Sequence, residues 1–414
     1  MIVRVVHDDA TSASFDLGDG LTLAATSRGA WANDLVVRVE HPNADLGLDD
    51  PLMFHLLVGR GIGVDFVAFE EHRQLSVDPD SARYVRRVLR ARSRSVEVST
   101  DPVVRPGVGD AMRTDGADGD APSEGEMEAA FDRLRFADTV NLICVPPYAA
   151  DGGSPAPSVY AAALVVALDL RAMVLVDPPD AWGDVATAAL MTGITSLQSA
   201  NVVMTYPAVR AFDPVRDGLE RTFAPSPFFA GLVSRTDATR GVWVSPAGLD
   251  GQLRGVTELE QPLTEAEIGQ LNQRGVNALV RRGVAGPVVW GSRTSLGADT
   301  RGSEWKYVAV RRLALYIEES LRRGLQWAVF EPNDGPLHAQ IRGAVGDFMQ
   351  QLFRQGAFAG SQVREAYDVK CDLETTTPED AARGVVNIIV RFAPLKPAEF
   401  VVLTFQQMAG QAGS

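Results

Sequence analysis

The chain has 414 residues, which is longer than a single compact core usually allows, so we expect two or three domains. Its 46% hydrophobic and 22% charged residues are typical of a folded globular protein and exclude a largely disordered chain. The net charge of -14 argues against binding to nucleic acid, which depends on clustered Lys and Arg.

The first hundred residues read mainly as β-strands. Residues 80–90 predict a helix, because Pro79 and Asp80 supply a start signal. The glycines within 59–63 predict a hairpin turn rather than a dinucleotide site, because a strand follows them instead of a helix. Strands are expected in the opening MIVRVVHD and at 21–26, 35–40, 53–58, 64–69 and 95–98.

Residues 101–128 are rich in Gly, Asp, Pro and Glu and contain few large apolar side chains. This composition predicts a solvated acidic loop, and its acidic residues do not follow the spacing of a calcium-binding EF-hand. We interpret residues 26–128 as an inserted β-rich outer domain that ends in this loop. Residues 1–25 are assigned to the opening strands of an α/β core.

Residues 129–285 alternate apolar strands with helices. Helices are expected from about Ser158 and after Trp182, and the strands are VNLICVPP (140–147), AMVLVDPP (172–179) and ANVVMTYP (200–207). This alternation predicts a parallel sheet that is buried on both faces. Each strand ends in proline, which lacks a donor N–H and therefore terminates it.

Residues 286–396 are assigned to a C-terminal α/β core. Just before it, Thr264 and Glu267 predict the capping box of a helix. Two amphipathic helices are expected at 305–326 and 335–355, because their apolar residues recur at helical spacing. The remaining predicted elements are the strand GPVVWGS from Gly286, a turn at 291–297, and strands at 367–373 and 385–392.

The chain closes with a predicted C-terminal arm, residues 397–414. Phe400 to Phe405 reads as a strand, yet it follows Pro394 and Pro397 and has no later sequence to pair with. Such a strand pairs either within its own subunit or with another molecule. The expected fold class is therefore mixed α/β, with an α/β inner core, a β-rich inserted outer domain and an extended C-terminal arm strand.

The sequence contains no recognisable active-site motif. A nucleotide-binding P-loop, a paired-histidine zinc motif and a nucleophile elbow are all missing. Cys144 and Cys371 lie far apart, which suggests neither a zinc site nor a disulfide and fits a reducing cytoplasm. We expect no catalytic residue, no cofactor and no metal.

The start of the chain does not predict export. Met1 and Ile2 lead directly into a strand-like segment without the pattern of a secretion signal. The longest apolar run, residues 161–168, is too short to span a membrane.

Several segments look familiar as an ordered set. They include VVWGSRTSLG within 288–334, NLICVPP, VDPPDAW, and the stretches 235–248, 253–256, 352–377 and 392–407. Together they resemble contractile tail sheath proteins, the family that includes phage tail sheaths and the sheaths of extracellular contractile injection systems.

The resemblance implies a structural polymer rather than an enzyme. Subunits would form stacked hexameric rings around an inner tube, and the sheath would contract to drive that tube through a target envelope. The energy would be stored in a metastable extended lattice. The implied partners are further copies of the chain, an inner tube protein, and baseplate and cap proteins, with assembly in the cytoplasm and release as a phage tail or phage-tail-like particle.

Sheath proteins also pass terminal arms between neighbours, which offers a partner for the final strand. The resemblance therefore implies that one arm segment adds to a sheet of another subunit; its residues are Glu399, Phe400, Val401, Val402, Leu403, Thr404, Phe405 and Gln406. Family members carry a further N-terminal segment before the strand that VRVV resembles. Here Met1 falls at that strand, so we expect either a truncated start or a shortened form.

One surface of the subunit would face the inner tube. We expect the helix at 335–355 to provide it, with Arg342 and Arg354 as charged contacts. The alternative is an ordinary core helix with solvated arginines.

The sequence is also compatible with two other functions. One is a sheath-related cap or adaptor protein. The other is an α/β enzyme with a ligand at the carboxyl ends of its strands, where VPP and VDPP stand instead of a glycine-rich turn.

Overall fold

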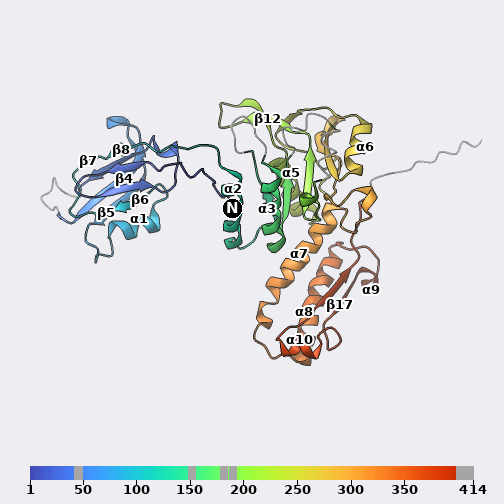
Figure 1. The fold of residues 1–414 in the computed structure, drawn as a ribbon. Helices are drawn as coiled ribbons and strands as arrows, with labels where there is room; N and C mark the ends of the chain where they lie inside the picture. The colour runs from blue at the N-terminus through green and yellow to red at the C-terminus, as the bar shows by residue number, and fades with distance from the viewer. Residues whose placement is uncertain (42–49, 148–154, 178–184, 186–193, 398–414) are drawn as a thin grey trace, which may run out of the picture. The chain divides into compact units, whose positions relative to one another are not determined.

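The computed structural model describes residues 1–41, 50–147, 155–177, 185 and 194–397. The chain forms two compact units, Met1–Ala130 and Phe131–Ser414, which are described separately (Figure 1).

The first unit is built from two four-stranded antiparallel sheets, in the orders β6-β2-β1-β8 and β5-β4-β3-β7. Apolar residues that alternate along the strands, such as Phe15, Leu23, Val37 and Leu56, fill one core shared by both sheets. The elements are β1 Ser14–Asp16, β2 Thr22–Ala25, β3 Val36–Glu40, β4 Met53–Arg60, β5 Val67–Ser76, β6 Val96–Thr100, β7 Gly109–Asp110, β8 Met112–Thr114, α1 Val85–Arg92 and α2 Glu124–Phe131.

Most predicted strands of this unit are confirmed, but the structure groups the start of the chain differently. The strand predicted in the opening MIVRVVHD is wrong, because residues 1–8 form no strand. β1 and β2 pair with β8 and β6, and their side chains belong to the core of the first unit. The alternation of apolar residues reveals that a strand is half buried, but not which core receives it.

The predicted acidic loop also contributes to this unit. Within 101–128 it contains β7 and β8, each of which adds an edge strand to one sheet, and the start of α2. Such short strands are held by backbone hydrogen bonds, which composition does not reveal.

The second unit contains a five-stranded sheet in the order β16-β15-β11-β10-β9. In this sheet β9, β10, β11 and β15 are parallel to one another, and β16 is antiparallel to β15. All residues of β10 and β11 are buried, as the apolar runs predicted. The elements are β9 Leu142–Cys144, α3 Pro157–Asp169, β10 Met173–Val176, β11 Val202–Tyr206, α5 Ser226–Arg240, α6 Glu265–Gln273, β15 Val276–Arg282 and β16 Gly286–Val289.

Several details of this region test the sequence predictions. The capping box of Thr264 and Glu267 at the start of α6 is confirmed. The helix predicted after Trp182 falls outside the described residues apart from Val185. A three-stranded sheet was not predicted; it consists of β12 Val209–Asp213, β13 Leu219–Phe223 and β14 Val256–Leu259.

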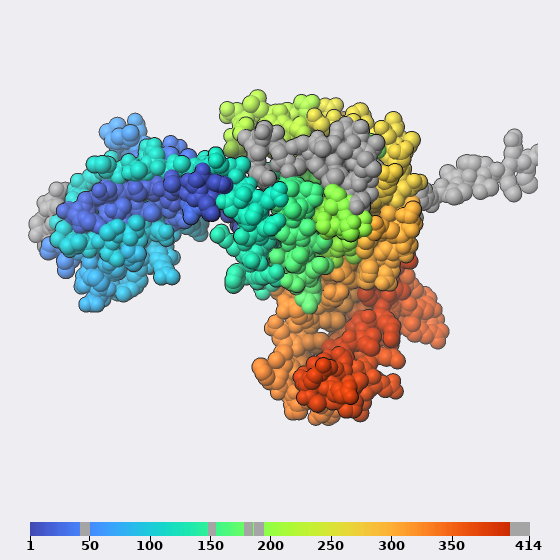
Figure 2. All heavy atoms as spheres, in the orientation of Figure 1, coloured from blue at the N-terminus to red at the C-terminus, as the bar shows by residue number. Residues whose placement is uncertain are grey.

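The C-terminal part of this unit begins with α7 Val308–Gly324, which leads away from the parallel sheet (Figure 1). The predicted apolar faces of α7 and α8 meet in one core through residues such as Leu313, Ile317, Ile341 and Val345. This part supplies the orange and red surface of Figure 2. Its other elements are α8 Gly335–Arg354, α9 Val363–Ala366, β17 Tyr367–Lys370, α10 Pro378–Ala382 and β18 Ile389–Phe392.

No helix among the described residues is both long enough and apolar enough to cross a membrane.

Candidate assembly surfaces

The clearest candidate for contact with another molecule is the small sheet formed by β17 and β18. The two strands pair antiparallel from Tyr367 opposite Phe392 to Lys370 opposite Ile389. Within the described ranges no third strand joins this sheet. A two-stranded sheet leaves backbone N–H and C=O groups unpaired along both edges, and such edges accept an added strand.

The two edges have different surroundings. Helix α8 packs against β17, and the Tyr367 hydroxyl donates to Gln350 Oε1 at 3.0 Å. Between α7 and β18 lies a groove of about 490 Å³ lined largely by apolar side chains. Ile317 in this groove is buried, whereas Leu321, Leu325, Ile388, Val390 and Phe392 are only half buried. A strand added beside β18 places its side chains over apolar surface that is still incompletely covered.

The predicted arm begins close to this sheet. Residues Glu399–Gln406 lie outside the described residues, so the structure does not test their pairing. The segment before them is held firmly: the Ala359 amide donates to the Ala393 carbonyl at 2.9 Å, and the Ala393 amide donates to the Ala366 carbonyl at 2.8 Å. The arm therefore leaves from a fixed point just after β18.

The two arginines proposed to face a tube are both exposed residues of α8. Arg342 donates from Nη1 to the Cys371 carbonyl at 2.8 Å, which partly commits it to the subunit itself. Arg342 and Arg354 are twelve residues apart, which corresponds to about 120° around a helix and about 18 Å along it. They therefore do not form one compact charged site.

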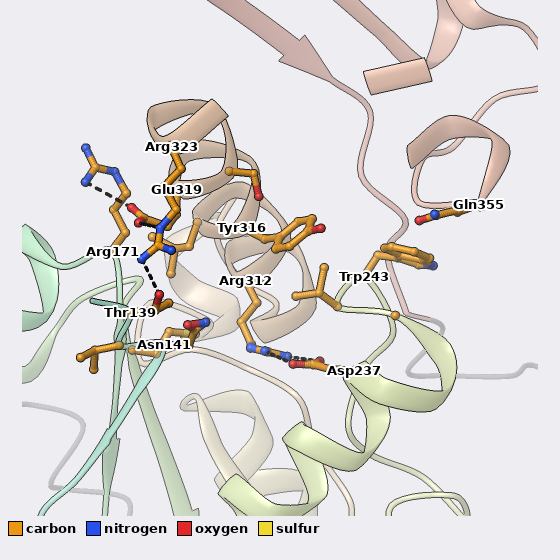
Figure 3. Close-up of a pocket in the computed structure, with 16 residues that line it drawn as sticks. Thr139, Asn141, Arg171, Asp237, Trp243, Arg312, Tyr316, Glu319, Arg323 and Gln355 are labelled. Atoms are coloured by element: carbon orange, nitrogen blue, oxygen red, sulfur yellow. Dashed lines mark hydrogen bonds and ion pairs between the residues drawn. The ribbon is translucent and has the colours of Figure 1, made fainter. Parts of the chain in front are cut away.

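A second feature is a charged cleft of about 480 Å³ where α7 meets the amino ends of β9 and β10 (Figure 3). Arg323 donates to the Asp138 carbonyl and to Thr139, and its Nε lies 2.7 Å from Glu319 Oε1. Arg322 Nη2 lies 2.6 Å from the same Glu319 oxygen. Hydrogen bonds from these arginines lower the pKa of Glu319 to about 2, so the cluster is fully ionised at neutral pH.

A second ion pair lines the same cleft, with its arginine buried and its carboxylate half buried (Figure 3). Arg312, which is only 7% exposed, donates from Nη1 to Asp237 Oδ1 at 2.7 Å, joining α7 to α5. Ligands of open α/β sheets bind at the carboxyl ends of the strands, and this cleft lies at the opposite edge. The paired charges act as a clamp between α7 and the parallel-sheet region.

The carboxyl edge of the sheet contains Asp177, directly after β10. Its carboxylate accepts from the Ser226 amide at 2.8 Å and from the Ser226 hydroxyl at 2.7 Å, where α5 begins. Burial raises the pKa of Asp177 to about 6. Burial also raises the pKa of the nearby Cys144 thiol to about 11, which keeps that thiol protonated and a poor nucleophile at neutral pH.

The sequence predicted only a turn at 291–297, but this segment contains a buried polar network. Arg293 is 1% exposed and donates from Nη1 to the carbonyls of Asn272 and Gly297 and to Asp299. The Asn277 amide nitrogen donates to the Arg293 carbonyl at 2.8 Å and to the Met204 carbonyl at 3.0 Å. The network ties the loop to β11 and β15. The sequence signal for this network is an arginine among small residues that follow a buried strand, and it was not recognised as a prediction.

The described residues contain no group of three or more His, Cys, Asp or Glu side chains arranged to hold a metal ion.

Comparison with known proteins identifies the family. The family model for the phage tail sheath protein central domain matches residues 121–295, and the one for the phage tail sheath C-terminal domain matches residues 300–408. A putative prophage major tail sheath protein of Pseudomonas aeruginosa (strain UCBPP-PA14) is 26% identical over 280 residues, which are 66% of this chain and 66% of that protein. The chain thus spans just under two thirds of that relative.

Solved structures agree with this match. One similar structure is the sheath complex of PVC, an extracellular contractile injection system, in the contracted state. A chain of that complex is 27% identical to this chain and superimposes with a TM-score of 0.58, over 68% of this chain and 75% of that chain. The sheath tail protein Lin1278 of Listeria innocua shares the fold, with 13% identity and a TM-score of 0.61, over 93% of this chain and 82% of that chain. The mixed α/β fold class is therefore confirmed, and the protein belongs to the family of contractile tail sheath proteins.

Proposed function

We propose that the chain is a sheath subunit that polymerises as stacked hexameric rings around an inner tube and contracts to drive the tube through a target envelope. The observation that carries this proposal is the two-stranded β17–β18 sheet, whose edges are open among the described residues and which lies just before a predicted donor strand. The matched relatives are named as sheath proteins, which supports a structural role without catalysis.

The polymer is proposed to be held together by strand exchange. The segment Glu399–Gln406 of one copy adds to the free edge of β18 in another copy, where the groove beside α7 receives its apolar side chains. Donor and acceptor are different surfaces, so each copy both gives and receives an arm. Such a heterologous contact propagates into rings and helices rather than closing as a dimer.

Strand exchange suits a lattice that changes shape. Each backbone hydrogen bond contributes only about 0.5–1.5 kcal/mol net, but several in one strand act together with the burial of alternate side chains. In this proposal the subunits rotate relative to one another while the exchanged strand stays paired. In this proposal the energy for contraction is stored in the extended lattice at assembly, so no nucleotide is consumed.

The sheath has further proposed partners. α8 is proposed to face the inner tube through Arg354, with Arg342 restricted by its bond to the Cys371 carbonyl. Baseplate and cap proteins would bind the two ends of the polymer. Assembly is proposed to take place in the cytoplasm, followed by release within a phage tail or phage-tail-like particle.

Negative-stain electron microscopy of the purified full chain, with and without inner tube protein, tests the proposed function. Helical tubes with hexameric cross-section are expected. Discrete rings that never lengthen would instead indicate the cap or adaptor function, and monomers under all conditions would contradict both.

A further inference from the structure

A cavity of about 510 Å³ adjoins the point where the described chain ends. Its walls come from α6, from the loop at 245–248, from the loop at 290–293 that follows β16, and from Pro397. Pro397 is half buried in this position. The chain therefore enters the wall of a cavity immediately before its last 17 residues, 398–414.

Two residues that line this cavity each have one polar atom without a hydrogen-bond partner among the described residues. These atoms are Oδ1 of Asn272 and Oγ of Ser292, and both atoms are buried. Ser292 is only 5% exposed. The Asn272 side chain is held in place because its Nδ2 donates to the Trp290 carbonyl at 3.0 Å, which leaves Oδ1 as an acceptor. Buried polar groups without partners are rare in native proteins, because each costs the free energy of its lost hydration.

The backbone beside these atoms is shaped for close approach. A Cβ atom placed on Gly291 would lie 2.4 Å from Asn272 Oδ1, so only glycine fits there without displacing that side chain. Ile268 and Trp290 add apolar wall to the cavity. The site thus combines apolar surface with an unused acceptor and an unused hydroxyl, which is the combination that an extended peptide segment with a large apolar side chain requires.

The position of Pro397 in the cavity wall indicates that the segment directly after it binds in this cavity. An extended backbone advances about 3.3 Å per residue, so residue 400 lies at most about 10 Å beyond Pro397. Ala398 and Glu399 come first, and Phe400 is the first large apolar side chain of the arm. Residues this close to Pro397 meet the cavity of their own chain at a far higher effective concentration than any other copy provides.

We propose that this cavity binds the root of the arm in its own subunit. Phe400 lies against Ile268 and Trp290, a backbone N–H of the segment 398–400 donates to Asn272 Oδ1, and the Ser292 hydroxyl donates to a backbone carbonyl of the same segment. Of the predicted arm strand Glu399–Gln406, residues 401–406 are then the part that pairs with the neighbouring copy. The inference thus deepens the proposed strand exchange and rests on it for its functional meaning.

Anchoring the root has a consequence for assembly. A segment that is fixed at one end loses less conformational entropy when its free end docks than a segment that is mobile throughout. The anchor also sets the direction in which residues 401–406 leave the subunit, and the binding of Phe400 determines which face of the exchanged strand meets the groove beside β18.

Amide hydrogen exchange of the full chain, measured by mass spectrometry below the concentration at which it assembles, tests the anchor. In the unmodified chain we expect the amides of 398–400 to exchange at least ten-fold more slowly than those of 408–414. This protection should not change on dilution, because binding within one chain is unimolecular. Unprotected amides at 398–400, or protection that disappears on dilution, would overturn the proposal.

Matched variants identify the contacts. Phe400→Ala should abolish the protection, whereas Phe405→Ala, the same change at the other end of the strand, should leave it intact. Ser292→Ala should weaken the protection several-fold, because it removes the proposed donor. If Phe400→Ala and Phe405→Ala behave alike, or if Ser292→Ala has no effect, the assigned contacts are wrong.

The outcomes separate this anchor from the proposed function. A chain that keeps dilution-independent protection but forms no tubes contradicts the sheath function and leaves the anchor standing. A chain that forms tubes without protection at 398–400 contradicts the anchor alone.

Discussion

The parallel sheet and the β17–β18 sheet satisfy their backbone groups in different ways. Strands β10 and β11 have a partner on each side and are buried along their whole length. β17 and β18 have only each other within the described part of the chain, and the apolar groove beside β18 is half covered. The central strands of the parallel sheet are therefore fully paired within one subunit, whereas in the proposed polymer the C-terminal sheet gains a partner strand through assembly. Changes to the first should alter folding, and changes to the second should alter polymerisation.

Removing the arm should produce the largest effect and separate the two regions most clearly. Deletion of residues 397–414 should leave a folded monomer that forms no tubes, because the open edge of β18 then has no donor strand. Electron microscopy and analytical ultracentrifugation measure the outcome. Deletion of 408–414 alone is the matched control and should preserve assembly; tubes of normal length from the longer deletion would disprove strand exchange.

Breaking the ion pair between Arg312 and Asp237 should weaken folding rather than assembly. Asp237→Ala leaves Arg312 charged, almost fully buried and without its carboxylate, which should cost about 3 kcal/mol of unfolding free energy. Urea denaturation measures this loss.

Arg322→Ala is the control for this change, because Arg322 is 45% exposed and pairs with Glu319, which lines the same cleft. Its loss should cost less than about 1 kcal/mol. Equal effects of the two substitutions would mean that α7 is not clamped through Asp237.

The parallel-sheet region should also show a characteristic pH dependence. The folded-state pKa of Asp177, about 6, lies above its ordinary value of 3.8, so the folded state binds more protons between these two values. Its contribution to stability should therefore fall as the pH rises from about 4 to about 6, by roughly 2–3 kcal/mol. Asp177→Asn should remove this component, which urea denaturation across that pH range detects. An unchanged profile in the variant would show that Asp177 titrates normally in the folded protein.

The smallest effect is expected at the proposed tube contact. Arg354→Glu should reduce co-sedimentation of sheath with inner tube protein a few-fold and leave the unfolding free energy unchanged, because the residue is exposed. Arg342→Glu should also lower stability slightly, since it removes the bond to the Cys371 carbonyl. Normal tube binding by the Arg354 variant would remove α8 from the proposed tube-facing surface.

The sequence predicted the elements whose pattern is local. The helices α7 and α8 follow from apolar residues at helical spacing, such as Leu337, Ile341 and Val345 on α8, and the parallel strands follow from their continuous apolar runs. β13 was missed because its sequence LERTF is mostly exposed and lacks a clear apolar face.

Long-range polar contacts could not be predicted in this way. Arg312 and Asp237 are separated by 75 positions, and nothing in the local sequence marks either of them as a member of an ion pair. The buried Arg293 lies among Gly, Ser and Thr, which read as a turn because each favours loops. The unpaired atoms of Asn272 and Ser292 became visible only when α6 and the loop after β16 came together in the fold.

In the proposed strand exchange, one copy completes the β17–β18 sheet of another copy. A cryo-electron microscopy map of the assembled polymer, at a resolution that traces the backbone, tests it directly. Strand exchange predicts density for residues 401–406 hydrogen-bonded along β18 of a neighbouring copy, with continuous density back to Pro397 of the donor. Density that returns residues 401–406 to a sheet of their own subunit would contradict it.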